Sequence, residues 1–262
     1  MSGAAIVRLF ELVYLFGAGL TALKLFRSQL HRRYRVFFVY LLFLVPYTGA
    51  FLWLDLIPGA RSNVYFYSWV LSAPLLWVFH ILVVLALYRL ILERHKGLYT
   101  LGRWAMYLVI LVSVGVSALT LLPRITPAMP QQSRIMGYTV AAERGVDFAL
   151  VMFLLLMLFL LTRYPVPLSR NVVVIAVVFV LFFLGTNLSL LLRNVFGLHL
   201  TSAVNTGLTG ISAACAVAWL LLLNPQGEET RQVLPWIDPA HEQTMLRHLD
   251  ALNAALLKVS RN

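Results

Sequence analysis

The sequence predicts an all-α membrane protein, a bundle of seven transmembrane helices. Of its 262 residues, 61% are hydrophobic and only 12% are charged, and the mean hydropathy is +0.84. Soluble domains are about half apolar and about a quarter charged. Here the apolar residues form separate runs of roughly 20, about the length that one helix needs to cross the hydrocarbon core of a bilayer. The runs lack the alternation of apolar and polar residues that an outer-membrane β-barrel requires.

The positions of the basic residues predict how these helices are oriented. The formal net charge is +11, and most Lys and Arg residues lie between the apolar runs. The predicted loops 27–35, 93–103 and 163–170 hold nine of them, against four in the alternate loops. Because basic loops face the cytoplasm, we expect the N-terminus outside and the C-terminus in the cytoplasm. In a membrane protein this charge sets orientation, so we expect no nucleic-acid partner.

Two regions follow from this pattern. Residues 1–224 are predicted to form the transmembrane domain, and residues 225–262 a cytoplasmic tail with a short amphipathic helix at 239–258. The expected spans are 4–26, 35–57, 65–92, 103–122, 138–162, 170–193 and 200–223.

The first three spans carry polar residues that become candidates for a site. In the first span, Arg8 and Glu11 are three residues apart and so share a helix face. Small residues at 17–22 of the same span allow another helix to approach closely. The second span has Asp55 at its outer end, and the third holds His80 near its middle.

The later spans add a charged cluster and two asparagines. The fifth span opens with Glu143, Arg144 and Asp147 and continues as an almost purely apolar run. Glu143 and Asp147 are four residues apart, so both carboxylates face the same side of the helix. The sixth span carries Asn187 in its outer third and Arg193 at its outer end.

The seventh span predicts one continuous polar face, because its polar residues recur at spacings of three and four. They are Ser202, Asn205, Thr209 and Ser212. We expect the hydroxyl groups to pack against neighbours or to bond back to their own helix.

Several of these side chains lie at a similar depth below the outer surface. Glu11, Asp147, Asn187 and Asn205 are each roughly six to nine residues into their spans, about 10 Å below the outer headgroups. A charge facing hydrocarbon is costly, so such groups should point into the bundle. The candidates for a ligand- or ion-binding layer are Glu11, His80, Glu143, Asp147, Asn187 and Asn205. Asp147 is the first of them, because it lies deep and has no obvious partner within its own helix.

A structural role for the same layer stays open. Its charged residues could form ion pairs that fix helix register, with Arg8, Arg144, Arg193 and Asp55 as the candidates. Asn187 and Asn205 would then hold neighbouring helices together.

Few residues suggest a cofactor or a reaction. No second histidine lies at the depth of His80, so bis-histidine haem ligation is not expected. We expect instead that His80 is neutral and hydrogen-bonded to a neighbouring span. The one cysteine, Cys215, lies in an apolar run and offers no disulfide or thiolate metal site. No His-Glu-x-x-His motif or phosphate-binding glycine loop is present. The sequence therefore predicts no catalytic residue, no metal and no cofactor, and we do not expect an enzyme.

Short motifs carry a resemblance to a known group. They are Glu143-Arg144, the loop Arg163-Tyr-Pro-Val-Pro-Leu-Ser-Arg170, the Tyr65-Phe-Tyr-Ser-Trp69 start of the third span and Tyr88-Arg89 at its end. With these motifs the chain resembles uncharacterised bacterial seven-span integral membrane proteins. The resemblance covers all seven spans and implies the bacterial cytoplasmic (inner) membrane. Since no activity is known for that group, it implies no site residue.

We therefore expect a non-enzymatic, receptor- or sensor-like membrane protein. Its polar outer cavity would bind a small ligand or ion, and its basic face and tail helix would meet a cytoplasmic or membrane protein partner or anionic lipid. Two alternatives stay open. One is a transporter or proton-handling subunit that uses Glu11, Asp147 and His80 as a relay, and the other is an accessory structural subunit of a larger membrane complex.

Overall fold

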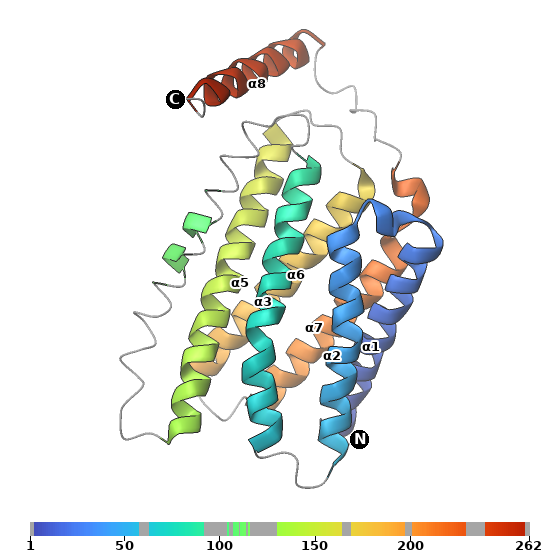
Figure 1. Ribbon diagram of the computed structural model, residues 1–262, viewed down its shortest axis with the longest axis vertical. Coiled ribbons are helices and arrows are strands. Elements are labelled where there is room, and N and C mark those ends of the chain that lie inside the picture. Colours follow the sequence, from blue (N-terminus) through green and yellow to red (C-terminus); the bar gives the residue numbers. More distant parts are fainter. Residues whose placement is uncertain are drawn as a thin grey trace.

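The computed structural model describes residues 3–57, 63–91, 130–163, 169–196, 201–228 and 239–259, with a few positions between 104 and 115. Every element in these ranges is helical (Figure 1). The elements are α1 (Gly3–Arg27), the 3-10 helix η1 (Leu30–Arg32), α2 (Arg35–Leu56), α3 (Asn63–Ile91), α5 (Gln131–Arg163), α6 (Arg170–Phe196), α7 (Thr201–Leu222), the 3-10 helix η4 (Pro225–Glu228) and α8 (Pro239–Val259). The predicted span 103–122 falls almost wholly outside the described residues.

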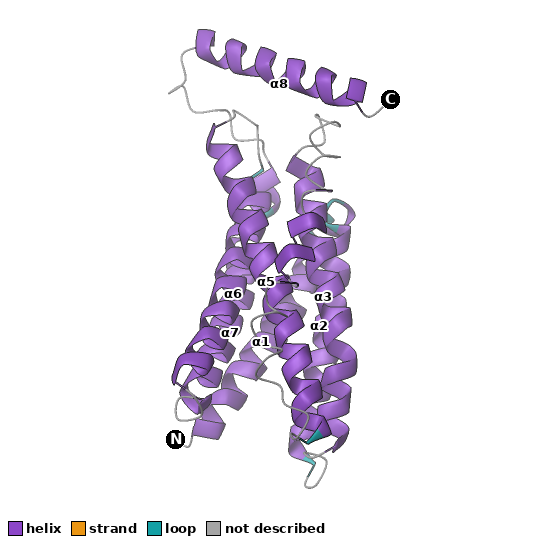
Figure 2. Cartoon of the chain, turned by 90° about the vertical axis from the view of Figure 1, so that its left-hand side faces the viewer, coloured by secondary structure: helices purple, strands orange, loops and turns teal. Residues whose placement is uncertain are grey.

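The long helices begin and end within a few residues of the predicted spans, with one exception. The helix α5 begins at Gln131, well before the predicted start at residue 138. The helix α8 lies where the sequence predicts the amphipathic tail helix. Figures 1 and 2 show it lying across one end of the bundle.

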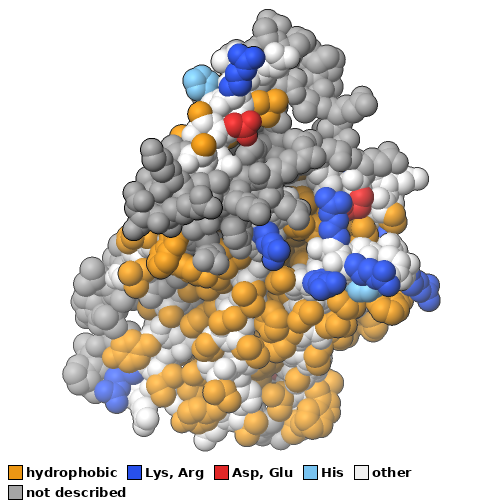
Figure 3. Space-filling model, turned by 45° about the horizontal axis from the view of Figure 1, so that its top comes forward, with side chains coloured by type: hydrophobic (Ala, Val, Ile, Leu, Met, Phe, Trp, Pro, Cys, Tyr) orange, Lys and Arg blue, Asp and Glu red, His pale blue; other side chains and the backbone are white. Residues whose placement is uncertain are grey.

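Five of the described helices are long and apolar enough to cross a membrane: α1, α2, α3, α6 and α7. The helix α5 is not among them, since its described side chains end at Leu158 and include Glu143, Arg144 and Asp147. Many large apolar side chains face outward. Leu71, for example, is 83% exposed and Phe16 is 64% exposed. Side chains of this kind cover much of the face seen in Figure 3, and together with the five helices they indicate a protein embedded in a membrane.

The long helices form a closed ring. The neighbours in order are α1, α2, α3, α5, α6 and α7, and α7 packs in turn along α1. Contacts between α3 and α6 cross the middle of the ring. The chain runs up and down, so one end holds η1, η4 and the C-terminal ends of α3 and α7. We call this the η1 end and the opposite one the N-terminal end (Figure 1).

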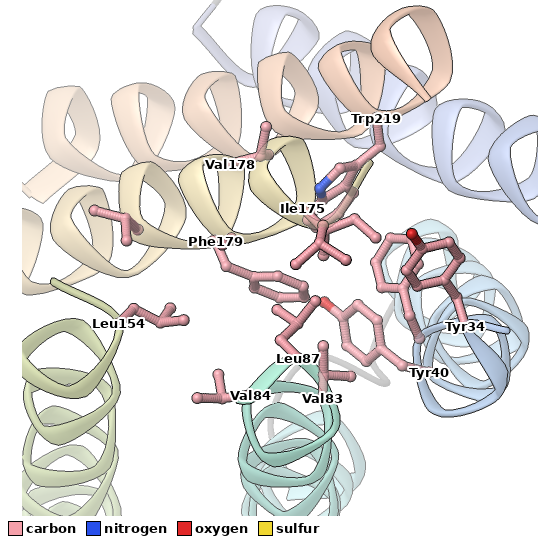
Figure 4. Packing of buried hydrophobic residues seen from close by; sticks show 14 of the residues in the cluster. Tyr34, Tyr40, Val83, Val84, Leu87, Leu154, Ile175, Val178, Phe179 and Trp219 are labelled. Atoms are coloured by element: carbon pink, nitrogen blue, oxygen red, sulfur yellow. The ribbon is translucent and has the colours of Figure 1, made fainter. Parts of the chain in front are cut away.

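Aromatic and aliphatic side chains fill the ring (Figure 4). Tyr40 from α2, Phe179 from α6 and Trp219 from α7 are almost completely buried. The ring centroid of Phe179 lies 4.9 Å from that of Trp219 and 5.8 Å from that of Tyr40. Val83, Val84 and Leu87 of α3 are also buried in this core. Van der Waals packing of this kind is a main source of association between helices in lipid. Apolar side chains in a bilayer are already out of water, so burying them between helices adds little hydrophobic free energy.

Small residues let α1 and α7 approach closely. A Cβ atom built on Gly17 would lie 3.0 Å from the Cβ of Ala216. Ala18 and Ala22 are buried on the same helix. At the η1 end the Lys24 ammonium donates to the carbonyl of Leu220 in the last turn of α7, at 2.6 Å. A cation at this position also matches the negative end of the helix dipole.

The segment after α7 is tied to the η1 end by a polar network. The buried Asn171 amide donates to the carbonyl of Asn224 at 2.8 Å and to Glu228 Oε1 at 2.6 Å. Its Oδ1 accepts a hydrogen bond from the Asn224 N–H at 3.1 Å. Tyr34 donates to Glu228 Oε1 at 2.6 Å, and Arg33 pairs with Glu228 Oε2 at 2.8 Å. Burial, and next the bond to Glu228, raise the pKa of Tyr34, so its hydroxyl remains a donor at neutral pH.

The close approach of α1 and α7 leads to a first prediction. We expect Gly17→Val to lower the free energy of unfolding by about 1–3 kcal/mol, because an overpacked contact forces the backbones apart. Thermal unfolding in detergent measures the change. The matched control is Gly49→Val on α2, where no atom lies within 4 Å of the added Cβ. Equal melting temperatures for the two variants would contradict the close packing.

Candidate ligand-binding site

A cavity of about 620 Å³ opens between α1, α2, α3 and α7 in the N-terminal half of the bundle. Its polar lining comes from Arg8, Glu11, Thr48, Asp55, Ser202, Asn205, Thr209 and Ser212, and its aromatic lining from Tyr14, Tyr47, Phe51, Tyr65 and Trp69. We call it the N-terminal pocket. Four of the site and ion-pair candidates, Glu11, Asn205, Arg8 and Asp55, thus line one cavity, together with the rest of the predicted polar face of α7.

An ion pair crosses the pocket from α1 to α2. Arg8 reaches Asp55 Oδ2 with Nε at 3.2 Å and with Nη2 at 3.1 Å. The two side chains are 45% and 32% exposed. The spacing of Arg8 and Glu11 in the sequence suggested a pair within α1, whereas the guanidinium bonds to the neighbouring helix instead.

Glu11 lies beside this pair on α1. It is half-buried and lies within the electrostatic influence of both Arg8 and Asp55. Its carboxylate forms no hydrogen bond with any other described residue, nor an ion pair within 4 Å. Within the described part of the chain, no hydrogen bond therefore competes for the Glu11 carboxylate with a donor that enters the pocket.

Two hydroxyl groups on the α7 wall of the pocket are available to a ligand only as hydrogen-bond acceptors. The Thr209 hydroxyl donates to the carbonyl of Asn205 at 2.9 Å, and the Ser212 hydroxyl donates to that of Leu208 at 3.0 Å. A hydroxyl has one proton to donate and two lone pairs. Each of these two hydroxyl protons is used in a bond within the helix. The two hydroxyl oxygens can therefore only accept a hydrogen bond from a ligand.

The opposite wall is aromatic and was not foreseen as part of a site. The ring centroids of Tyr47 and Phe51 are 4.9 Å apart, and Phe51 meets Tyr65 edge to face at 5.2 Å. Tyr47 and Phe51 are four residues apart, as are Tyr65 and Trp69, so each pair shares a helix face. The four-residue spacing is a sequence signal from which this aromatic wall could have been predicted. The aromatic residues around Tyr65 also fit a belt at the membrane interface, however, so the spacing alone does not indicate a site.

Glu143 and Asp147 on α5 do not line the N-terminal pocket. Glu143 is half-buried and close enough to Tyr47, which lines the pocket, to interact with it electrostatically. Asp147 is only 3% exposed and is similarly close to Tyr40 in the core. No other described residue forms a hydrogen bond or an ion pair with Asp147.

The remaining candidates are placed as follows. The Asn187 amide donates to the carbonyl of Phe183 in its own helix, at 3.0 Å, so it does not bridge two helices through this bond. Arg144 is half-buried on α5, and the side chain of Arg193 lies outside the described part of the structure.

His80 occupies an aromatic cage and not a polar layer. It is 3% exposed, and its ring centroid lies 5.1 Å from that of Phe183, 5.5 Å from that of Tyr40 and 5.7 Å from that of Phe182. Neither ring nitrogen has a hydrogen-bond partner among the described residues. The expected bond to a neighbouring span is therefore wrong. Ring packing from α2 and α6 surrounds His80 instead.

Comparison of the chain with protein-family models, with curated proteins and with solved structures finds no match. The resemblance to bacterial seven-span membrane proteins stays a prediction. What the site does is therefore inferred from its residues and geometry.

The lack of an ion-pair partner for Asp147 among the described residues leads to a second prediction. We expect Asp147→Asn to leave the thermal stability in detergent unchanged or to raise it, because the change removes a buried ionisable group and breaks no described ion pair. Asp55→Asn, which breaks the pair with Arg8, is the comparison variant and should cost at most about 1 kcal/mol. A loss of about 3–5 kcal/mol in Asp147→Asn, as expected when a buried pair is broken, would show that Asp147 is a structural ion-pair residue.

Proposed function

We propose that the protein is a receptor- or sensor-like ligand-binding module of the bacterial inner membrane, and that its N-terminal pocket binds a small organic cation. It would have seven spans, the N-terminus outside and the tail in the cytoplasm. The observation that carries the proposal is the Glu11 carboxylate, without a described hydrogen-bond partner, in a pocket that also holds the accepting hydroxyls of Thr209 and Ser212 and several aromatic rings.

Charge favours a cation over an anion. The described charged groups of the pocket are one guanidinium, on Arg8, and two carboxylates, on Glu11 and Asp55. Arg8 is engaged by Asp55, so the carboxylate of Glu11 is left for a ligand. An ammonium group donates up to three hydrogen bonds and accepts none. Such a group matches a wall whose Thr209 and Ser212 hydroxyls can only accept.

The aromatic wall supports the same ligand class. A cation over the face of Trp or Tyr gains roughly 0.5–2 kcal/mol, the larger value when water is excluded. Tyr47, Tyr65 and Trp69, which line the pocket, supply rings of this kind. A ligand with an ammonium group and a compact apolar body would use both walls at once.

The charge distribution supports an outward-facing pocket. Described basic residues gather at the η1 end, opposite the pocket: Lys24, Arg27, Arg32, Arg33, Arg35, Arg89 and Arg170. Figure 3 shows Lys and Arg side chains on that end, beside the broad apolar surface. The positive-inside rule places this end in the cytoplasm and the N-terminal pocket on the outer side.

One observation favours a second candidate, a proton-handling transport subunit. Asp147 and His80 are both buried, and neither ring nitrogen of His80 has a hydrogen-bond partner among the described residues. Buried ionisable groups inside a membrane bundle are typical of proton relays. The cage of His80 counts against this candidate, because the described rings around His80 are those of Phe side chains and Tyr40, and neither ring nitrogen of His80 is hydrogen-bonded to them.

The proposal is tested with phenethylammonium as the probe and 2-phenylethanol as its neutral isostere. We expect the ammonium to raise the melting temperature of the purified protein in detergent and the alcohol to have little effect. Glu11→Gln should weaken binding of the ammonium at least about tenfold, a cost typical of losing a charged partner.

The control for this experiment is Asp250→Asn, which removes an exposed carboxylate from α8, far from the pocket. It should bind the ammonium as the unmodified chain does. Equal responses to the ammonium and the alcohol, or unchanged affinity in Glu11→Gln, would contradict a cation site.

A further inference from the structure

A second cavity, of about 420 Å³, lies at the η1 end between α2 and α3. Arg32, Arg33, Arg35 and Arg89 form its rim, and apolar side chains that include Phe37 and Leu87 form its floor. We call it the arginine groove. It is separate from the N-terminal pocket and shares no lining residue with it.

Three of the four rim arginines have no acidic partner among the described residues. Arg33 is paired with Glu228 at 2.8 Å. Arg32, Arg35 and Arg89 are exposed, and no ion pair joins any of them to another described residue. Three guanidinium groups around one groove repel one another, and an anion among them would relieve that repulsion. Planar guanidinium groups bind phosphate oxygens in bidentate fashion.

The start of α2 adds a further anion-binding element to the rim. The helix begins at Arg35, and its N-cap residue, Tyr34, forms no side-chain cap. The Tyr34 hydroxyl is instead engaged by Glu228. The first-turn N–H groups of a helix without a cap favour an anion, and so does the positive end of the helix dipole. Residues 34–37 of this first turn line the groove.

The floor of the groove indicates that the anion has an apolar part. Val36 and Phe37 of α2 and Val83, Leu87 and Leu90 of α3 line it. The groove therefore offers charge at its rim and apolar side chains below. Of these side chains Val36 and Leu90 are partly exposed, and a free phosphate would leave them in contact with water, whereas an acyl chain would cover them.

From this arrangement we infer that the arginine groove binds one anionic phospholipid. The headgroup phosphate lies between Arg32, Arg35 and Arg89 at the start of α2, and an acyl chain follows the floor between α2 and α3. Juxtamembrane arginines attract anionic lipids in this way. The inference is independent of the cation pocket at the other end of the bundle.

Native mass spectrometry of the full chain in detergent tests the inference, with phosphatidylglycerol and phosphatidylcholine of the same acyl chains as probes. We expect one phosphatidylglycerol to be retained in preference to phosphatidylcholine. The triple variant Arg32→Gln, Arg35→Gln, Arg89→Gln should lower that retention at least about tenfold, given the stabilisation that each basic residue contributes.

The matched control removes the same charge from the same end outside the groove, with Arg27→Gln, Arg170→Gln and Arg247→Gln, all at exposed positions. It should retain phosphatidylglycerol as the unmodified chain does. If the two triple variants lose phosphatidylglycerol equally, retention depends only on the overall positive charge of this end, and the proposed site in the groove is contradicted. The single variant Arg89→Gln, which should show a smaller loss in the same direction, provides the test if the groove variant fails to fold.

Glycerol 3-phosphate distinguishes a lipid from a soluble phosphate. It carries the phosphate without acyl chains, and we expect it to bind far more weakly than phosphatidylglycerol. Equal binding of the two would overturn the role of the apolar floor.

Discussion

The cost of leaving a charge in hydrocarbon governs how this bundle is arranged. Its described helices expose apolar side chains over much of their surface and confine charged ones to the two ends and the interior. At the N-terminal end the ion pair of Arg8 and Asp55 joins two helices around a polar cavity. At the η1 end Glu228 joins Tyr34, Asn171 and Arg33. Both polar ends depend on the tight packing between them, most of all on the close contact of α1 with α7.

The aromatic core separates the two ends. Tyr40, Phe179 and Trp219 pack across the ring (Figure 4), and His80 is caged beside them. The tightly packed centre lies between the polar pocket at one end and the arginine groove at the other, and the two cavities share no lining residue. Pro46 and Pro74 lie inside α2 and α3, the two helices that line both cavities.

Much of the fold follows from the sequence, because apolar run length and helical spacing decide where helices lie and which residues share a face. The polar face of α7 and the position of Glu11 on α1 can be predicted in this way. The partner of Arg8 could not be predicted, since it depends on how α1 docks on α2. The cage around His80 is likewise a product of packing between helices distant in sequence. The aromatic wall of the pocket was missed because the same residues also suit a membrane interface.

Thiol labelling in intact cells tests most directly whether the N-terminal pocket is open to the outside. The only native cysteine, Cys215, is buried and provides a low background. Asn205→Cys places a thiol at an exposed position in the pocket, and Arg35→Cys places one at the rim of the arginine groove. A membrane-impermeant maleimide added outside should label the first variant without permeabilisation and the second only after it. Labelling in the reverse pattern, or none at Asn205→Cys, would contradict an outward-facing pocket.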